Sequence, residues 1–170
     1  YGGGPAFESE VAKVIELGYR AQPLPTLSWS ATAFYSRYDK LRTLEPQTGP
    51  AAPELFLFEN QARGRTRGVE MWGSWQAAPV WRLNAGLVVQ RVRIDPLPGS
   101  HDMSATNPSL TTNDPGRHWL LRSSVDLTDS SALDLTLRHT GALPRPAVPS
   151  YYELDGQWLW QAHPAMDVAL

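Results

Sequence analysis

Histidine and serine side chains are the first candidates for chemistry in this chain. His118 and His139 lie close in the sequence to Ser123 and Ser124, and a hydrolase needs a histidine base beside a serine nucleophile. Neither histidine has an evident partner that would orient it. We therefore expect structural roles for these four residues and no enzymatic activity.

A second candidate lies in the longest polar segment, 95–116. His101 and Asp102 carry imidazole and carboxylate groups, which are usual metal ligands, and Met103 follows them directly. Three adjacent residues in a loop make a weak site. We therefore expect His101, Asp102 and Met103 to be loop candidates for ligand contact, with no resident metal and no cofactor.

Composition excludes several classes of protein. The chain has 170 residues, a net charge of −2 and no cysteine, which excludes disulfide scaffolds and cysteine-based metal sites. Its pI of about 6.1 gives no support for a nucleic-acid partner. No apolar run approaches the roughly 18 residues that a membrane-spanning helix needs.

The elements that carry these side chains show the two-residue period of β-strands. In the window 81–92, apolar residues such as Leu83 and Leu87 alternate with polar ones such as Arg82 and Asn84, so one face is apolar and the other polar. Helical patterns free of proline and glycine are absent, and the predicted class is all-β. Strands are expected at 11–20, 26–38, 55–76, 80–94, 117–127, 132–140 and 150–161, with an eighth beginning at Met166.

The connections between these strands alternate strictly in length. Short turns are expected at 22–25, 77–79, 128–131 and 163–164, and long loops at 39–54, 95–116 and 143–149. Tight turns on one rim and long loops on the other are typical of an antiparallel up-and-down transmembrane β-barrel. Seven strands and a partial eighth cannot close a barrel, so we expect a fragment. No export signal is visible at Tyr1, which indicates a start that is truncated, processed or not exported.

The two faces predict two environments. Aromatic rings near the short turns fall on the apolar face, as expected for a girdle at a membrane boundary. These are Tyr19, Trp29, Trp75, Trp81, Trp158 and Trp160. Charged residues fall on the other face, which predicts a wet lumen. The candidates for contact with the lumen or with a plug are Glu16, Arg20, Glu70, Arg82, Arg122 and Arg138.

Arg63, Arg65 and Arg67 alternate along one side of a long predicted strand. Guanidinium groups bind phosphates and carboxylates through paired hydrogen bonds. These arginines are predicted to attract an anionic siderophore or to border lipopolysaccharide phosphates. Odd positions on this strand face outward, which favours lipopolysaccharide.

Four segments resemble strands of the TonB-dependent outer-membrane receptors, in the same order and spacing. Phe7-Glu8-Ser9-Glu10 with Ile15-Glu16-Leu17-Gly18-Tyr19-Arg20 is similar to the family's "PE…yElGyr" strand. Ala31-Thr32-Ala33-Phe34-Tyr35 with Tyr38-Asp39-Lys40-Leu41 resembles its "a-x-a-F-y…y-d-x-l" strand. Asn60 with Arg67-Gly68-Val69-Glu70 resembles "N-x-g…x-G-v-E", and Pro149-Ser150-Tyr151-Tyr152-Glu153-Leu154-Asp155 resembles "v-P-x-y-x-x-x-D".

The resemblance implies a barrel of about 22 strands around a plug domain. Residues 1–170 would then supply about seven or eight of these strands, without the plug domain and the final strands. It also implies a location in the outer membrane of a Gram-negative bacterium, among lipid and lipopolysaccharide. A TonB complex would act through the missing N-terminal region. The implied cargo is a metal chelate or vitamin such as a ferric siderophore, haem or cobalamin.

Two rival interpretations remain open at the level of sequence. A porin-type barrel shares the pattern of turns but needs no plug. A soluble carbohydrate-binding β-sandwich would use Trp29, Trp72 or Trp158 as a stacking platform. The sandwich predicts a second sheet over the face that carries Leu133, Leu135 and Leu137, whereas the barrel predicts that this face is bare.

Overall fold

The fold is all-β. In this computed structural model the described residues are 2–3, 7–46, 56–102, 114–144, 147–163 and 166–169. Among them no helix is long and apolar enough to cross a membrane. The strands are β1 (Gly2–Gly3), β2 (Val11–Leu24), β3 (Leu27–Pro46), β4 (Phe56–Ala78), β5 (Trp81–Pro96), β6 (Arg117–Thr128), β7 (Ser131–Thr140), β8 (Leu143–Pro144), β9 (Ala147–Val148), β10 (Tyr151–His163) and β11 (Met166–Ala169).

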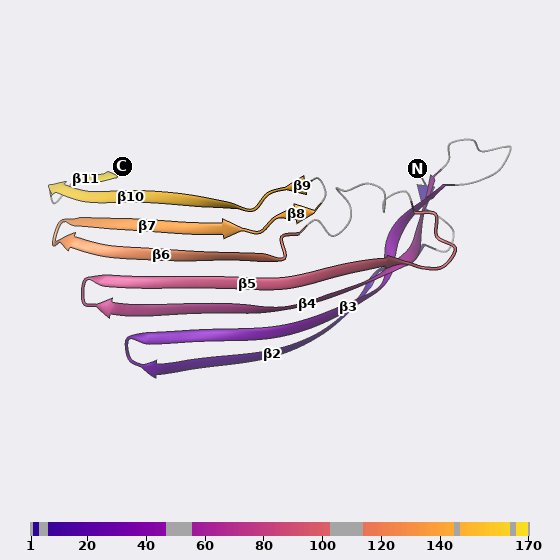
Figure 1. Ribbon diagram of the computed structural model, residues 1–170, viewed down its shortest axis with the longest axis horizontal. Coiled ribbons are helices and arrows are strands. Elements are labelled where there is room, and N and C mark those ends of the chain that lie inside the picture. Colours follow the sequence, from indigo (N-terminus) through magenta and orange to yellow (C-terminus); the bar gives the residue numbers. More distant parts are fainter. Residues whose placement is uncertain are drawn as a thin grey trace.

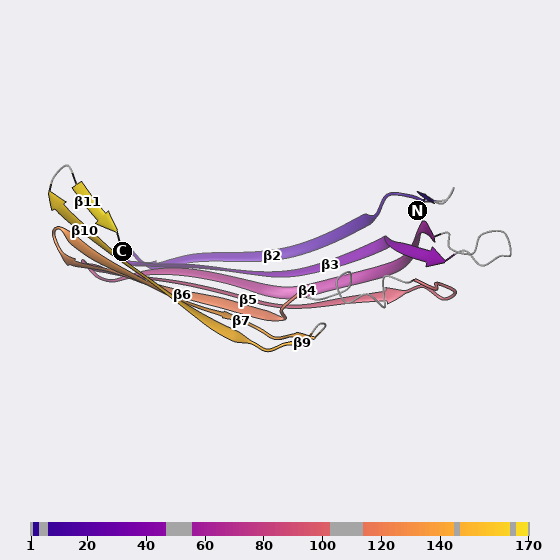
Figure 2. The same cartoon turned by 90° about the horizontal axis from the view of Figure 1, so that it is seen from above.

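The long strands form one open sheet in the order β11-β10-β7-β6-β5-β4-β3-β2. Each strand is antiparallel to its neighbours. β7 and β10 pair directly, and the chain between them forms the separate hairpin of β8 and β9. Figure 1 shows the strands side by side, and Figure 2 shows them as a single curved layer. The predicted all-β, up-and-down arrangement is confirmed. The short β1, which the sequence did not predict, pairs in parallel with Leu57 and Phe58 of β4.

The alternation of short and long connections is also confirmed. Only two residues separate β2 from β3, β4 from β5, and β6 from β7. The segments between β3 and β4, β5 and β6, and β7 and β10 are longer, and the strand ends that they join lie at the other end of the sheet (Figure 1). In an up-and-down barrel these two ends are the two rims.

Several predicted boundaries are wrong. The expected turns 22–25 and 77–79 begin inside β2 and β4, the expected loop 143–149 contains β8 and β9, and the largest difference concerns 39–54. The expected loop 39–54 is partly strand, because β3 continues to Pro46 and pairs with β4 as far as Phe56. The register shifts between Tyr38 and Leu41, and Lys40 has a φ of 59°. A bulge bends a strand without ending its pairing, so the β3–β4 hairpin extends well past the point where the polar composition suggested a loop.

The sheet has almost no hydrophobic core. Among the described residues Ala62 and Val88 are the only buried apolar side chains, whereas Ile15, Leu17 and Leu154 are 73%, 77% and 71% exposed. Soluble monomers rarely expose apolar patches of more than a few hundred Å². No second layer covers Leu133, Leu135 and Leu137 in the described part of the chain. The bare face predicted for a barrel is therefore present, and the soluble sandwich is not favoured.

Candidate functional site

The strand register divides the side chains into two faces. One row of paired residues runs Ala31, Met71, Leu87 and Trp119 across β3 to β6, and this side is called the apolar face. The neighbouring row runs Ser30, Trp72, Gly86, Leu120 and Arg138, and this side is called the polar face. Since side chains alternate along a strand, every second residue belongs to the same face.

The six predicted lumen residues share the polar face. By register Arg20 and Arg138 belong to the same row. Glu70 and Arg82 lie an even number of residues from that row along their own strands, so they are on the same face. The same holds for Glu16 and Arg122. The structure therefore places these charges together on one side of the sheet. Their contact with a plug stays a prediction.

Two ion pairs join neighbouring strands on the polar face. The Arg122 Nη2 atom lies 3.0 Å from Asp134 Oδ2, and the Ser124 hydroxyl donates to the other carboxylate oxygen. The Arg138 guanidinium pairs with Asp155 of β10. The arginine side chains of these pairs are about half exposed, at 50% and 48%. Exposed ion pairs of this kind contribute about 0–1 kcal/mol to the free energy of folding. They therefore link neighbouring strands of the sheet but add little to its stability.

Two glycines of the polar face lie beneath aromatic rings. A Cβ on Gly86 would come within 2.4 Å of the Trp72 ring, and a Cβ on Gly68 would come within 2.5 Å of both the Phe34 ring and the Val89 carbonyl oxygen. The close neighbours here are rings of the adjacent strands, which cover the glycine backbone.

A polar clamp joins the segment before β2 to the extended β3–β4 hairpin. The Asn60 amide donates to the carbonyl oxygens of Glu8 (2.9 Å) and Lys40 (2.6 Å), while its oxygen accepts from the Glu8 amide at 2.6 Å. The Glu8 carboxylate also pairs with the Lys40 ammonium, and Glu10 accepts from the Arg42 amide at 2.8 Å. The clamp therefore holds the Lys40 bulge, a left-handed conformation that is costly for a residue with a side chain.

The loop after β5 folds back onto the end of β3. The Glu45 carboxylate accepts from the Ser100 hydroxyl at 2.6 Å and from the His101 amide at 2.7 Å. Asp102 accepts from the Leu44 amide at 2.8 Å. One oxygen of the predicted ligand Asp102 thus anchors the loop, while His101 is exposed. Met103 lies outside the described residues, and no group of three metal-binding side chains occurs within them.

All six predicted girdle aromatics share the apolar face. By register Trp81 stands opposite Val125, and Trp158 opposite Leu133. Two of the indole N–H groups are satisfied on the same face, since Trp81 donates to Ser123 at 2.9 Å and Trp158 donates to Ser131 at 2.7 Å. Paired N–H groups lower the cost of placing these rings in hydrocarbon. Their role as a membrane girdle stays a prediction.

The candidate histidine and serine groups do not meet. Ser123 accepts from Trp81, Ser124 donates to Asp134, and His139 is 4% exposed between the rings of Trp119 and Tyr152. Neither serine is thus held by a histidine, as a catalytic pair requires.

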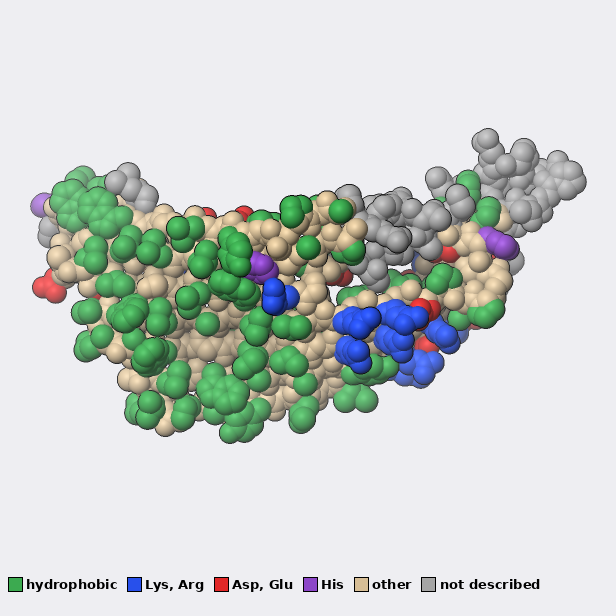
Figure 3. Space-filling model, viewed as in Figure 1, with side chains coloured by type: hydrophobic (Ala, Val, Ile, Leu, Met, Phe, Trp, Pro, Cys, Tyr) green, Lys and Arg blue, Asp and Glu red, His purple; other side chains and the backbone are tan. Residues whose placement is uncertain are grey.

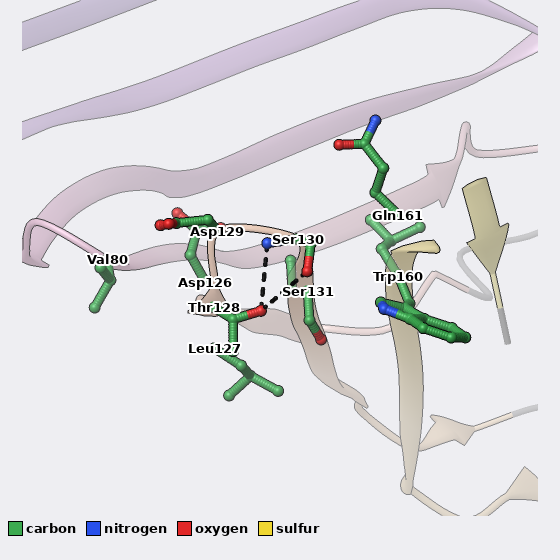
Figure 4. A pocket seen from close by; sticks show the side chains of 11 residues that line it. Val80, Asp126, Leu127, Thr128, Asp129, Ser130, Ser131, Trp160 and Gln161 are labelled. Carbon is green, nitrogen blue, oxygen red and sulfur yellow. Dashed lines mark hydrogen bonds between the residues drawn. The ribbon is translucent and has the colours of Figure 1, made fainter. Parts of the chain in front are cut away.

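An open groove lies at the short-turn end, between the β6–β7 turn and β10. Figure 4 shows the Thr128 hydroxyl accepting from the Ser130 amide at 3.3 Å, so the turn's polar groups bond to one another. Trp160 and Gln161 line the opposite side. Its two acidic residues, Asp126 and Asp129, flank a turn and have no histidine beside them in the lining. The groove therefore carries no catalytic or metal-binding group of side chains.

Comparisons with known proteins agree with this architecture. The family model described as "TonB dependent receptor-like, beta-barrel" matches residues 1–162. None of the curated proteins that were compared matches the chain.

Solved structures of transporters share the fold. The FrpB iron transporter from Neisseria meningitidis superposes with a TM-score of 0.74 at 15% identity, over 94% of this chain and 25% of that one. The pyoverdine receptor FpvA from Pseudomonas aeruginosa, bound to pyoverdine, gives 0.73 at 18% identity, over 96% and 25%. The copper transporter OprC gives 0.68 at 10%, over 96% and 25%. The chain spans about a quarter of the length of these proteins, and the likeness concerns the fold alone.

Proposed function

Because this chain belongs to the TonB-dependent receptor-like β-barrel family, we propose that it forms part of the wall of an outer-membrane receptor that imports a scarce nutrient. The observation that carries the proposal is the family match over residues 1–162, which coincides with the up-and-down strands β2 to β10. The exposed apolar face supports a membrane location, since lipid is the solvent in which that face is stable.

The proposed whole receptor has parts beyond residues 1–170. These are a plug domain inside the lumen, an N-terminal region that contacts the TonB complex, and the strands that complete a barrel of about 22. The open sheet supports this, because β2 and β11 each lack a partner on one side among the described residues, and an unpaired edge is costly in a membrane.

A ferric siderophore is the proposed cargo. Relatives of similar fold are described as the pyoverdine receptor FpvA, the ferric yersiniabactin uptake receptor FyuA and the siderophore receptor PiuA. The copper transporter OprC has a comparable fold at 10% identity, so the wall itself does not select the cargo. Haem and cobalamin are the alternative cargoes, and the long-loop end around His101 and Asp102 is the proposed contact region.

The two faces suggest how the wall works. The apolar face anchors the sheet in lipid, and the clamp around Asn60 holds the extended β3–β4 hairpin that supports the loop end. The polar face offers hydrated charges and half-exposed ion pairs to a plug. Such contacts are individually weak in water, which lets a plug move when energy from the inner membrane is applied. No bond is made or broken in this transport.

Uptake by the full-length receptor tests the proposal. A strain that lacks the gene would be complemented with the wild-type receptor, and uptake of radioactive iron would be measured with a panel of ferric siderophores, haem and free iron. The proposal expects uptake of one chelate that stops when the inner-membrane potential is collapsed. Uptake that persists without the potential would instead support a passive, porin-type barrel.

A further inference from the structure

An arginine cluster lies on the apolar face, where hydrophobic side chains would otherwise continue. Arg65 and Arg67 of β4 stand directly opposite Arg93 and Arg91 of β5. Together with Tyr35 of β3, these four arginines line one hollow. Figure 3 shows the basic side chains gathered beside the band of hydrophobic ones, toward the end of the sheet that carries the long loops.

The cluster is short of counter-charges within the protein. Arg93 bonds to Asp95 at 2.7 Å, and the adjacent Arg37 bonds to Asp39 at 3.1 Å. In the described part of the chain Arg65, Arg67 and Arg91 have no carboxylate within ion-pairing distance. Like charges directly opposite each other destabilise a pair of strands. Asp95 is a counter-charge for the Arg65–Arg93 pair, since its carboxylate is bonded to Arg93 and is also stabilised by the charge of Arg65. The Arg67–Arg91 pair has no such carboxylate among the described residues, and an external anion would supply its counter-charge.

The position of the cluster relative to the apolar band identifies the kind of anion. On β5 the outward residues from Trp81 to Val89 are apolar or small, and Arg91 is the next outward residue. The eleven residues from Trp81 to Arg91 make ten steps of about 3.3 Å each, which at a tilt of about 40° correspond to a height of about 25 Å. That is roughly the height of the apolar band in outer-membrane barrels. The guanidinium groups therefore lie at the level of lipid headgroups, on the side that faces lipid.

We propose that the arginine cluster is a binding site for the phosphate groups of an outer-leaflet glycolipid, the lipid A part of lipopolysaccharide. Guanidinium groups recognise phosphate through paired hydrogen bonds. The Tyr35 ring, 44% exposed at the edge of the cluster, suits the boundary between acyl chains and headgroup. The site rests on the proposed function for the outer-membrane location and for the orientation of the sheet, with the long loops outside the cell. A nutrient on its way through the lumen would not meet this face.

Native mass spectrometry of the full-length receptor in detergent, titrated with bis-phosphorylated lipid A, tests the site. The test variant is Arg67→Gln/Arg91→Gln. The matched control is Arg20→Gln/Arg82→Gln, which removes the same charge from the polar face. Because a charge-assisted bond contributes about one power of ten or more in affinity, the test variant should bind lipid A at least tenfold more weakly. The control should bind it like the wild type.

Two further arms identify the source of the phosphate. In the first arm the wild type is titrated with dephosphorylated lipid A, and its affinity should be no higher than that of the test variant for intact lipid A. In the second arm millimolar inorganic phosphate is added to the wild type with lipid A bound, and it should not displace the lipid. Arg67→Lys/Arg91→Lys keeps the charge but loses the planar guanidinium groups that bind phosphate through paired hydrogen bonds. Its affinity for lipid A should lie between those of the wild type and the test variant. Equal lipid A binding by the wild type and Arg67→Gln/Arg91→Gln would overturn the site, and displacement by inorganic phosphate would overturn the lipid as its source.

The two proposals fail in distinguishable ways. Removing like charges that stand opposite each other does not destabilise the fold. Arg67→Gln/Arg91→Gln should therefore reach the outer membrane as well as the wild type does. Outer-membrane fractionation and chelate uptake are measured in the same strains. A receptor that sits in the outer membrane and imports its chelate, yet binds lipid A equally with and without the two arginines, refutes the lipid site alone.

Discussion

The close contact of Gly68 with its neighbours leads to a sharp prediction about stability. A Cβ at this position would lie 2.5 Å from the Val89 backbone oxygen, about 0.9 Å inside the 3.4 Å at which ordinary contact begins. The Phe34 ring can rotate away, but the Val89 oxygen belongs to the backbone of the paired strand β5. Overpacking costs about 1–3 kcal/mol, and we expect Gly68→Ala to destabilise the barrel by an amount in the upper half of that range.

Gly73 provides the matched control on the same strand. Its added Cβ would meet Ser28 and Trp29 no closer than 3.6 Å, so Gly73→Ala should be neutral or stabilising by up to about 1 kcal/mol. Urea unfolding of the full-length receptor in detergent, followed by the gel shift between folded and unfolded barrel, gives both midpoints. If the two variants unfolded at the same urea concentration, the inferred approach of β5 to Gly68 would be refuted.

Three further substitutions test the contacts between segments. Asn60→Ala removes three hydrogen bonds at about 1 kcal/mol each, and hydrogen exchange of the amides near Glu8 should become about tenfold faster or more. Glu45→Ala releases the loop that carries Ser100, so limited proteolysis should cut that loop sooner while the strands stay protected. Asp134→Asn weakens an ion pair whose arginine is half exposed, and the free energy of unfolding should fall by about 1 kcal/mol or less.

Each of these substitutions has an outcome that contradicts its reasoning. Unchanged exchange in Asn60→Ala would show that the clamp does not hold the N-terminal segment. Equal cutting of Glu45→Ala and the wild type would mean that Glu45 does not fix the loop. A loss of several kcal/mol in Asp134→Asn would show that the polar face is far less hydrated than the exposure of Arg122 indicates.

The strands were predictable because their signal is local. Side chains alternate with a period of two, so Leu83 and Leu87 on one face and Arg82 and Asn84 on the other define β5 without any knowledge of its neighbours. The same parity put the six aromatics predicted for a girdle and the six charges predicted for a lumen on opposite faces, and the register has them so; their roles stay predictions.

The contacts at the loop end could not be predicted because they are non-local. Asn60 joins Glu8, 52 residues away, and Glu45 joins His101, 56 residues away. Nothing in the composition marks Lys40 as a left-handed bulge, since glycine and asparagine are the usual residues there. Asn60 and Glu8 both belong to the segments that resemble the family. The hydrogen bonds between them give a physical reason why these two residues occur together. The arginines of β4 were identified from the sequence, but their partners on β5 required the register.

The most direct test of the account is the environment of successive residues along β5. Single cysteines would be introduced from Leu83 to Val89 in the full-length receptor, spin-labelled in outer membranes, and compared for access to oxygen and to a water-soluble nickel complex. The account predicts a strict alternation, with Leu83, Ala85, Leu87 and Val89 open to lipid-dissolved oxygen and the residues between them closed to it. Uniform access of the nickel complex at every position would contradict a location of the sheet in the membrane and would favour a soluble protein instead.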